Sequence, residues 1–249
     1  MKGPRETEET GAAIVRAQPG NRDVSCRVVA TRRLRPIAGP VGAATLADTA
    51  PTTDDPHVTD APALDSRPDD LPVPTDDGAC DHLEGTRLPP VALGATDGRT
   101  VELAALAGRT VVYVYPRTGV PGTPLPDGWD AIPGARGCTP QSCSFRDHHA
   151  ELLEAGADAV FGLSTQTSDY QREAAERLAL PFALLSDASL AFCRALSLPT
   201  FEADGRTLAR RVTLVIDDGV VTKAFYPVFP PERSAADTLA WLRGEGAGG

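Results

Sequence analysis

The stretch TVVYVY, residues 110–115, is apolar throughout and rich in β-branched and aromatic side chains. This composition is typical of a strand covered on both faces, because the side chains of a strand alternate between the two faces of a sheet. Pro116 follows directly and ends the strand. A loop rich in Gly and Pro then runs to Gly137, and the pattern after it predicts a helix over residues 139–155. The chain thus passes from a buried strand, through a long loop, into a helix.

Strands and helices continue to alternate toward the C-terminal end. Short apolar runs predict further strands at residues 159–163, 182–185, 212–216 and 220–226. Capping residues and helical periodicity predict helices at residues 169–178, 190–196 and 230–243. An Asp-Gly turn at residues 97–98 adds a β-hairpin before the first buried strand. This order predicts an α/β sandwich with a mixed, mostly parallel central sheet, flanking helices and an N-terminal β-hairpin extension.

The aromatic residues locate the folded part of the chain. All seven Phe, four Tyr and two Trp lie from Tyr113 onward. Because aromatic side chains dominate protein cores, a globular domain in the first third is not expected. A signal peptide at the basic tract of residues 27–35 is an alternative there, but prolines interrupt its apolar run. We expect a disordered, low-complexity tail at residues 1–80, a folded domain at residues 81–244 and a flexible C-terminal end at residues 245–249. Residues 1 to about 75 should be dispensable for catalysis.

Charge and cysteine content narrow the class of function. The formal net charge of −10 argues against a nucleic-acid partner, since phosphate binding needs a clustered basic surface. No uncharged apolar run approaches the roughly 18 residues of a membrane span, so no membrane partner is expected. The five cysteines are an odd and scattered set, unlike a secreted disulfide scaffold. Reduced thiols in the cytoplasm, with one functional pair, suit this spacing.

Cys138 and Cys143 lie in the sequence CTPQSC, where the loop enters the expected helix. A helix N-terminus carries partial positive charge and favours a thiolate, which is the nucleophilic form of cysteine. If both residues are helical, their Cα atoms lie roughly 8–9 Å apart. A disulfide requires less than about 7 Å, so the pair bridges only if the first helical turns unwind.

Spacing alone is also compatible with two roles that involve no redox chemistry. The two cysteines are either unrelated buried residues, a common use of cysteine, or ligands of a zinc site with His148 and His149. A single helix does not converge four such side chains on one ion, which argues against the zinc site.

Three separated motifs resemble the peroxiredoxins of the bacterioferritin-comigratory, or Q, type. They are VYVYP, GCTPQSCSFRD and RVTLVIDDG, at residues 112–116, 137–147 and 211–219. The resemblance covers about residues 82–243 and implies a thioredoxin-like fold. It implies a thiol-dependent peroxidase that reduces hydrogen peroxide or organic hydroperoxides, with an antioxidant role.

The resemblance also implies roles for four residues. Cys138 is the peroxidatic cysteine and Cys143 the resolving one, which together form an intrachain disulfide. Arg211 stabilises the thiolate and polarises the peroxide, and Pro116 shields the site from water. No metal or organic cofactor is implied. The implied partners are the peroxide and a thioredoxin-like or other dithiol reductant, and we expect a monomer or a weak homodimer.

One part of the family motif is displaced. The family has three residues between Pro and a Thr or Ser, and two more before the Cys, whereas 21 residues separate Pro116 from Cys138 here. Position 135, three before the cysteine, is Ala. The hydroxyl that orients the thiolate and the peroxide must come from elsewhere in the loop, from Thr118 or Thr123. We prefer Thr118, because it stays close to the Pro116 turn.

The remaining candidates have weaker signals. Cys193 lies in an amphipathic helix, as a packing residue would, and Cys26 and Cys80 fall in the expected tail. Trp129, in the inserted loop of residues 123–137, either covers the pocket or anchors the loop. Two rival functions stay open: a thiol–disulfide oxidoreductase on the same fold, for which a Cys-x-x-Cys is expected, and a non-catalytic redoxin-like binding module.

Overall fold

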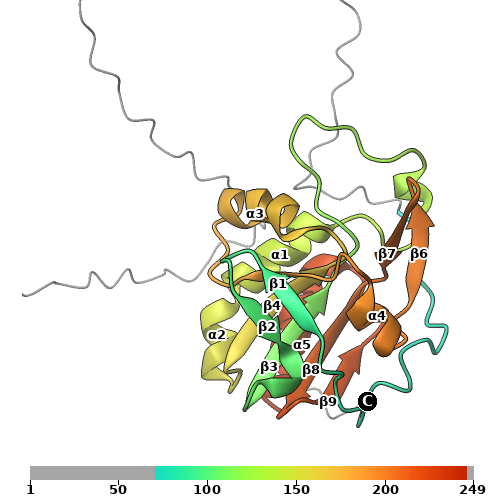
Figure 1. Cartoon of the computed structure of the whole chain (residues 1–249). Helices are drawn as coiled ribbons and strands as arrows, with labels where there is room; N and C mark the ends of the chain where they lie inside the picture. Colours follow the sequence, from blue (N-terminus) through green and yellow to red (C-terminus); the bar gives the residue numbers. More distant parts are fainter. Residues whose placement is uncertain (1–70, 246–249) are drawn as a thin grey trace, which may run out of the picture.

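The expected strand at residues 110–115 is β3, in the interior of a seven-stranded sheet (Figure 1). The computed structural model describes residues 71–245. The strand order is β2-β1-β5-β4-β3-β8-β9, and β6 and β7 form a separate two-stranded sheet. The strands are β1 (Ala92–Ala95), β2 (Thr100–Glu102), β3 (Arg109–Val114), β4 (Ala159–Ser164), β5 (Leu184–Ser186), β6 (Thr200–Ala203), β7 (Arg206–Ala209), β8 (Val212–Asp217) and β9 (Val220–Phe225).

Helices occupy most of the expected positions between these strands. None of those within residues 71–245 has the length and apolar character needed to cross a membrane. The α-helices are α1 (Cys138–Asp147), α2 (His149–Glu154), α3 (Ser168–Arg177), α4 (Ala191–Ala195) and α5 (Ser234–Leu242). The short 3-10 helices are η1 (Leu103–Ala105), η2 (Trp129–Ala131) and η3 (Pro231–Arg233).

The sheet is mixed, as expected, but only two of its strand pairs, β3-β4 and β4-β5, are parallel. Strand β1 of the β1-β2 hairpin pairs antiparallel with β5. Strand β8 of the β8-β9 hairpin pairs antiparallel with β3. A hairpin necessarily pairs antiparallel strands, so the two hairpins give the sheet its antiparallel flanks. The α/β class and the N-terminal hairpin are confirmed.

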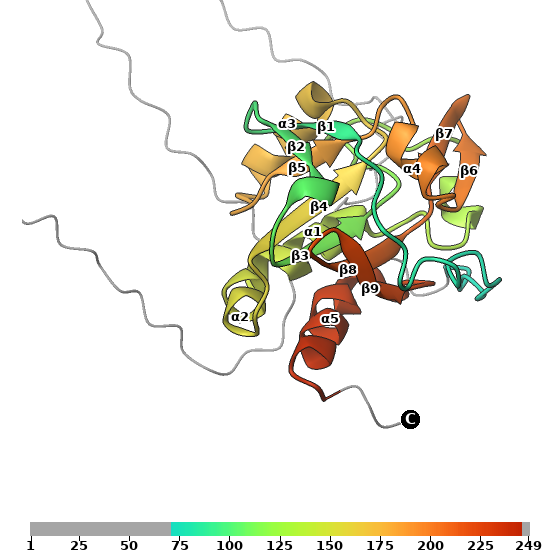
Figure 2. The ribbon, with the colours of Figure 1, turned by 60° about the horizontal axis from the view of Figure 1, so that its bottom comes forward.

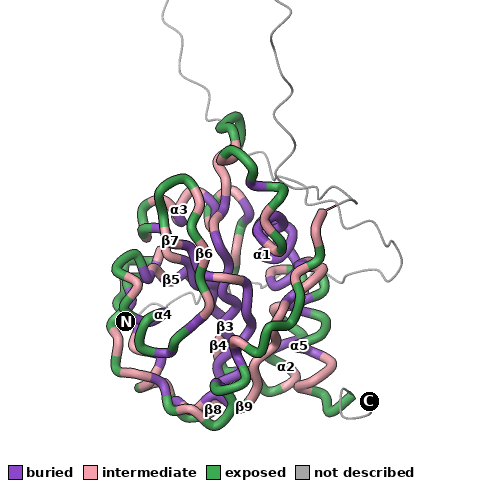
Figure 3. Tube along the Cα trace, turned by 90° about the vertical axis from the view of Figure 1, so that its right-hand side faces the viewer, coloured by how far each residue is buried: buried purple, intermediate pink, exposed green. Residues whose placement is uncertain are grey.

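Both faces of β3 are buried, which explains its continuous apolar sequence (Figure 3). Val112 and Val114 belong to a cluster that includes side chains of the β1-β2 hairpin and α4. Val111 and Tyr113 belong to a second cluster, on the opposite face, with side chains of α1, α2 and α5. Of these helices, α2 and α5 contact each other next to the sheet (Figure 2). The layers therefore place the N-terminus of α1 near the end of β3.

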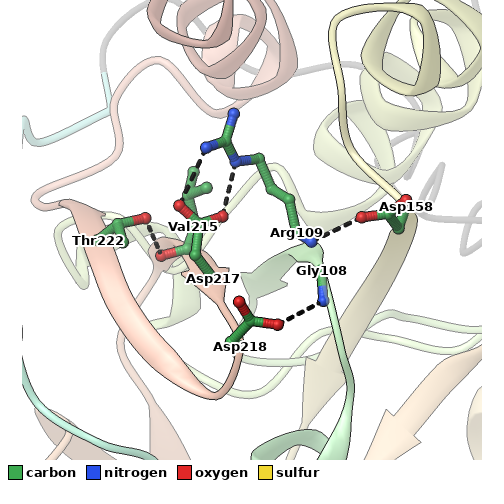
Figure 4. Close-up of polar contacts among 7 residues, drawn as sticks. All are labelled: Gly108, Arg109, Asp158, Val215, Asp217, Asp218 and Thr222. Atoms are coloured by element: carbon green, nitrogen blue, oxygen red, sulfur yellow. Dashed lines mark hydrogen bonds and ion pairs between the residues drawn. The ribbon is translucent and has the colours of Figure 1, made fainter.

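A pair of charged side chains joins the beginning of β3 to the end of β8 (Figure 4). Arg109 donates two hydrogen bonds to Asp217, at 2.7 and 3.0 Å. The Asp158 carboxylate accepts from the Arg109 amide at 2.7 Å, and Asp218 accepts from the Gly108 amide at 2.8 Å. Charged contacts thus fix where β3 begins and where β8 ends.

Two helices differ from their expected bounds. The helix expected over residues 139–155 is divided into α1 and α2 at His148, whose φ of −96° and ψ of 4° leave the helical range. The helix expected at residues 169–178 is α3, which begins one residue earlier, at Ser168, because the Thr167 hydroxyl caps it by accepting from the Tyr170 amide.

The β6-β7 hairpin was not predicted. Each strand has only four residues; β6 has no buried residue, and in β7 only Leu208 and Ala209 are buried. The signal that identifies it is Asp204-Gly205, where both residues have positive φ, 52° and 65°. An Asp-Gly pair with two positive φ values is the preferred two-residue turn of a β-hairpin.

The boundary expected at residue 81 excludes a core residue. Cys80 falls in the expected tail, but its side chain is only 5% exposed and packs in the cluster with Leu83 and Leu93. The sequence around Cys80 is rich in Asp and lacks aromatic residues, so composition alone did not reveal the burial. The rest of the expected tail before Leu71, and residues 246–249, lie outside the described residues.

Candidate active site

Cys138 is the first residue of α1, as its sequence predicts. The N-cap before it is Gly137, with φ 99°, a conformation that other residues rarely adopt. A Cβ at Gly137 would also collide with Pro231 of η3. Glycine therefore allows the tight turn that places Cys138 at the N-terminus of α1, where unpaired N–H groups favour negative charge.

Arg211 reaches this sulfur from the residue before β8. Its Nη2 donates to Cys138 Sγ at 3.3 Å, and the two side chains are only 3% and 5% exposed. The cysteine thiol itself lies 3.6 Å from the Ala135 carbonyl oxygen. A guanidinium held this close in a buried site stabilises a thiolate relative to a thiol. The structure thus brings Cys138 and Arg211 together, as the sequence resemblance implied.

A buried polar chain holds the Arg211 guanidinium in place. Arg211 Nη1 donates to Gln141 Oε1, and Gln141 Nε2 donates to Ser234 Oγ at 3.3 Å. The Ser234 hydroxyl in turn pairs with the Thr213 hydroxyl at 2.9 Å. Gln141 was not among the predicted site residues. Its position, three residues after Cys138 and so one helical turn away, is the sequence signal that identifies it.

The inserted loop also contributes to the arginine site. Arg211 Nη2 lies within 3.2–3.3 Å of three successive carbonyl oxygens, those of Gly134, Ala135 and Arg136. Trp129, only 3% exposed, packs with Ala135 and with Leu208 of β7. This packing agrees with the second role expected for Trp129, that of anchoring the inserted loop. The end of the anchored loop presents its carbonyl groups to Arg211.

Buried aromatic rings form the wall behind Cys138. Tyr113 stacks on Phe145 with ring centroids 4.3 Å apart, and its hydroxyl donates to Ser142 Oγ at 3.2 Å. Burial raises the pKa of Tyr113 above its ordinary value, and the nearby Cys138 charge adds to that shift. The Tyr113 hydroxyl therefore stays protonated and neutral, so it places no second negative charge near the Cys138 thiolate.

Pro116 and Thr118 are attached to the end of β4. The Pro116 carbonyl accepts from Ser164 Oγ at 3.0 Å. The Thr118 amide and hydroxyl donate to Gln166 Oε1 at 2.9 and 3.2 Å, and the Thr118 carbonyl accepts from Gln166 Nε2. These hydrogen bonds of Thr118 lead to Gln166, and none of them reaches Cys138. The role assigned to Thr118 therefore stays a prediction, and Thr123 is exposed in the loop.

Cys143 lies in the same helix as Cys138, as its spacing predicts. Its side chain is 1% exposed and packs against Leu178 and Leu180. Cys143 is disulfide-bonded in this structure, whereas Cys138 is a free thiol, so no bond joins the two. The resolving role assigned to Cys143 therefore stays a prediction.

Cys80, Cys193 and His149 have environments typical of packing residues. Burial raises the pKa of Cys80 to about 12 and also raises the pKa of Cys193, which keeps both as thiols. Burial lowers the pKa of His149, which lies next to Phe182. Within residues 71–245, no group of three His, Cys, Asp or Glu side chains is arranged to hold a metal ion.

Comparison with known proteins identifies the family. The family profile described as Redoxin matches residues 83–240. The chloroplastic peroxiredoxin Q of Sedum lineare is 34% identical over 162 residues, which cover 64% of this chain and 77% of that protein. The chloroplastic peroxiredoxin Q of Gentiana triflora is 32% identical over 187 residues, which cover 72% of this chain and 78% of that protein.

A solved structure agrees with this assignment. The peroxidoxin BcpB of Mycobacterium tuberculosis is 27% identical and superposes with a TM-score of 0.52, over 65% of this chain and 96% of that protein. The match covers nearly all of that protein, as expected if the two share one domain. The chain therefore belongs to the redoxin family and is a peroxiredoxin of the Q type, a thiol-dependent peroxidase with the thioredoxin-like fold.

Proposed function

We propose that Cys138 is the peroxidatic nucleophile of this peroxiredoxin and that Arg211 is its electrostatic partner. The observation that carries the proposal is the 3.3 Å contact between Arg211 Nη2 and Cys138 Sγ, in a site where both residues are buried. A buried cation close to the sulfur favours the thiolate, the form that reacts with peroxide. The same cation stabilises negative charge that develops on the departing peroxide oxygen.

In the first step, the Cys138 thiolate attacks one oxygen of the hydroperoxide. The S–O bond forms as the O–O bond breaks, the sulfur is oxidised to a sulfenic acid and the peroxide is reduced. The departing oxygen leaves as water or an alcohol once it takes up a proton. Arg211 contacts the Cys138 sulfur in the structure, and we assign to Pro116 and Thr118 the shielding and orienting of the peroxide.

In the second step, the Cys143 thiolate attacks the Cys138 sulfenic sulfur, and a disulfide forms as hydroxide leaves and is protonated to water. Both residues lie in α1, so their Cα atoms are roughly 8–9 Å apart as a helix. Because a disulfide needs less than about 7 Å, the first turn of α1 must unwind. A dithiol protein, such as a thioredoxin, then reduces the disulfide by exchange and is itself oxidised. We place this cycle in the reducing cytoplasm, in a monomer or weak homodimer.

The experiment compares wild type, Cys138→Ser and Cys193→Ser, each fully reduced before mixing with hydrogen peroxide in a stopped-flow instrument. Cys193→Ser is the matched control, because Cys193 is an equally buried thiol far along the chain in α4. We expect Cys138→Ser to abolish peroxide consumption and Cys193→Ser to retain it. Turnover by Cys138→Ser above a few per cent of wild type would reject the assignment. A chain that exchanges disulfides but does not consume peroxide would instead be a thiol–disulfide oxidoreductase.

A further inference from the structure

Three backbone carbonyl groups at the end of the inserted loop hold the Arg211 guanidinium. The carbonyl oxygens of Gly134, Ala135 and Arg136 each lie 3.2–3.3 Å from Arg211 Nη2, the nitrogen that contacts Cys138 Sγ at 3.3 Å. The Ala135 carbonyl also accepts from Cys138 Sγ, at 3.6 Å. Position 135 has no side-chain hydroxyl, yet its backbone oxygen contacts both the cation and the sulfur. The place of these carbonyl groups therefore fixes where the cation lies relative to the sulfur.

An ion pair ties these carbonyl groups to η2, in the middle of the same loop. Arg136 Nη1 donates to Asp130 Oδ1 at 3.1 Å, across a turn in which the Ala135 amide donates to the Ile132 carbonyl at 3.1 Å. The Arg136 side chain is only 5% exposed, whereas the Asp130 side chain is 48% exposed. A buried charge is costly unless an opposite charge compensates it, so the Asp130 carboxylate favours the inward position of Arg136. The ion pair therefore stabilises the loop conformation that carries the carbonyl groups.

Packing on the β6-β7 hairpin holds η2, and with it Asp130. Trp129, which precedes Asp130 in η2, lies against Phe201 of β6, with ring centroids 6.1 Å apart (Figure 1). Trp129 is buried and belongs to one apolar cluster with Ala135 and Leu208 of β7. These contacts give Asp130 a fixed place from which its carboxylate binds Arg136.

We propose that Asp130 and Arg136 are positioning residues for peroxide reduction, because their ion pair fixes the carbonyl groups that hold the Arg211 guanidinium beside Cys138. The inference rests on the proposed function of Cys138 and Arg211. If Asp130 loses its charge, the Arg136 side chain turns toward water and the backbone of residues 134–136 moves with it. The cation is then held less closely to the sulfur. Negative charge on the sulfur and on the departing peroxide oxygen is stabilised less, and the reaction slows.

The test uses the full chain, reduced, and measures the rate constant for Cys138 oxidation by hydrogen peroxide in a stopped-flow instrument. Asp130→Asn removes the charge and keeps the size of the side chain, whereas Asp130→Glu keeps the charge. Asp130→Asn is also made in the Arg211→Lys background, because a residue that acts through Arg211 loses its effect there. Asp147→Asn is the matched control: its carboxylate pairs with Arg146 at 2.8 Å and is similarly exposed, at 50%, but lies at the C-terminal end of α1.

We expect Asp130→Asn to slow Cys138 oxidation about fivefold or more, Asp130→Glu to recover most of the rate and Asp147→Asn to leave it unchanged. In the Arg211→Lys background, Asp130→Asn should slow the reaction no further. An unchanged rate in Asp130→Asn would overturn the inference. So would a loss that Asp130→Glu does not recover, or an equal fractional loss with and without Arg211→Lys, since a purely structural role acts in both backgrounds. A wild type that is not oxidised at Cys138, or an Arg211→Lys variant that reacts at the wild-type rate, would instead refute the proposed function.

Discussion

Arg211 and Cys138 are separated by 73 positions in sequence, yet Arg211 Nη2 lies 3.3 Å from Cys138 Sγ. The contact exists because β8 pairs antiparallel with β3, with Val212 opposite Val114. Arg211 is the residue just before that pairing, at the end of the sheet from which the chain continues to α1. Sheet register, rather than local sequence, therefore brings the cation to the nucleophile.

The first prediction concerns the shape of this cation. Arg211→Lys keeps the positive charge but loses the planar fork that serves Cys138, Gln141 and the loop carbonyls at once. We expect the rate constant for Cys138 oxidation to fall about 10²-fold, the range seen when one donor to a developing charge is removed. Stopped-flow oxidation measures it. Arg206→Lys, at an exposed position of β7, is the control, and an equal loss in that variant would show a nonspecific effect.

The second prediction concerns Gln141 as a positioning residue. Gln141→Leu removes the acceptor for Arg211 Nη1 and leaves a buried donor unpaired, so Cys138 oxidation should slow about tenfold. Gln141→Glu restores an acceptor and should recover most of that rate. If Gln141 had only a structural role, both variants would be destabilised, and Gln141→Glu would not recover the rate of Cys138 oxidation. Thermal unfolding measured alongside the rates separates the two cases.

The third prediction concerns resolution by Cys143. Cys143→Ser should retain the fast first reaction with peroxide, then stall as the Cys138 sulfenic acid and over-oxidise to the sulfinic form at high peroxide. In wild type, peptide mass mapping after oxidation should show a Cys138–Cys143 bond within one chain, with loss of helical signal as α1 unwinds. A mapped bond from Cys138 to Cys193 or Cys80, or normal cycling by Cys143→Ser, would contradict this.

The fourth prediction concerns stability and pH. Arg109 lowers the pKa of Asp217 through their hydrogen bonds and its charge, although burial opposes the shift. A carboxyl with a lowered pKa in the folded state stabilises the fold above its unfolded pKa, near 3.9, and loses this contribution as pH falls through the folded pKa. Asp217→Asn should therefore lower the unfolding free energy by about 1 kcal/mol at pH 7, and the difference from wild type should vanish at acid pH.

Chemical denaturation of wild type and Asp217→Asn between pH 7 and pH 2.5 checks this prediction. Asp237→Asn is the control, because its pair with Arg233 is more exposed, with side chains 46% and 67% accessible. Exposed pairs contribute little, so the control should stay within about 0.5 kcal/mol of wild type. A difference for Asp217→Asn that persists unchanged at low pH would exclude the ion pair as its cause.

Several features of the fold follow from local sequence alone. The run at residues 110–115 is apolar at every position because both faces of β3 are covered, and that requirement is visible without any partner strand. The hairpin of β8 and β9 and the start of α1 at Cys138 are likewise local, since turn residues and helix starts depend on a few neighbouring residues. The Asp204-Gly205 hairpin gives only a weak signal, because each of its strands has only four residues.

By itself, the sequence determined the α/β class, the candidate nucleophile and, through its motifs, the family. Only the tertiary structure decided which groups surround that nucleophile. The contacts of Arg211 with Gln141 and with the Gly134 carbonyl, and the burial of Cys80, join segments distant along the chain. Such contacts depend on strand register and on how the inserted loop packs through Trp129. Periodicity and spacing report on residues that are close in sequence, whereas the active site is formed by residues that are distant in sequence and close only in the folded structure.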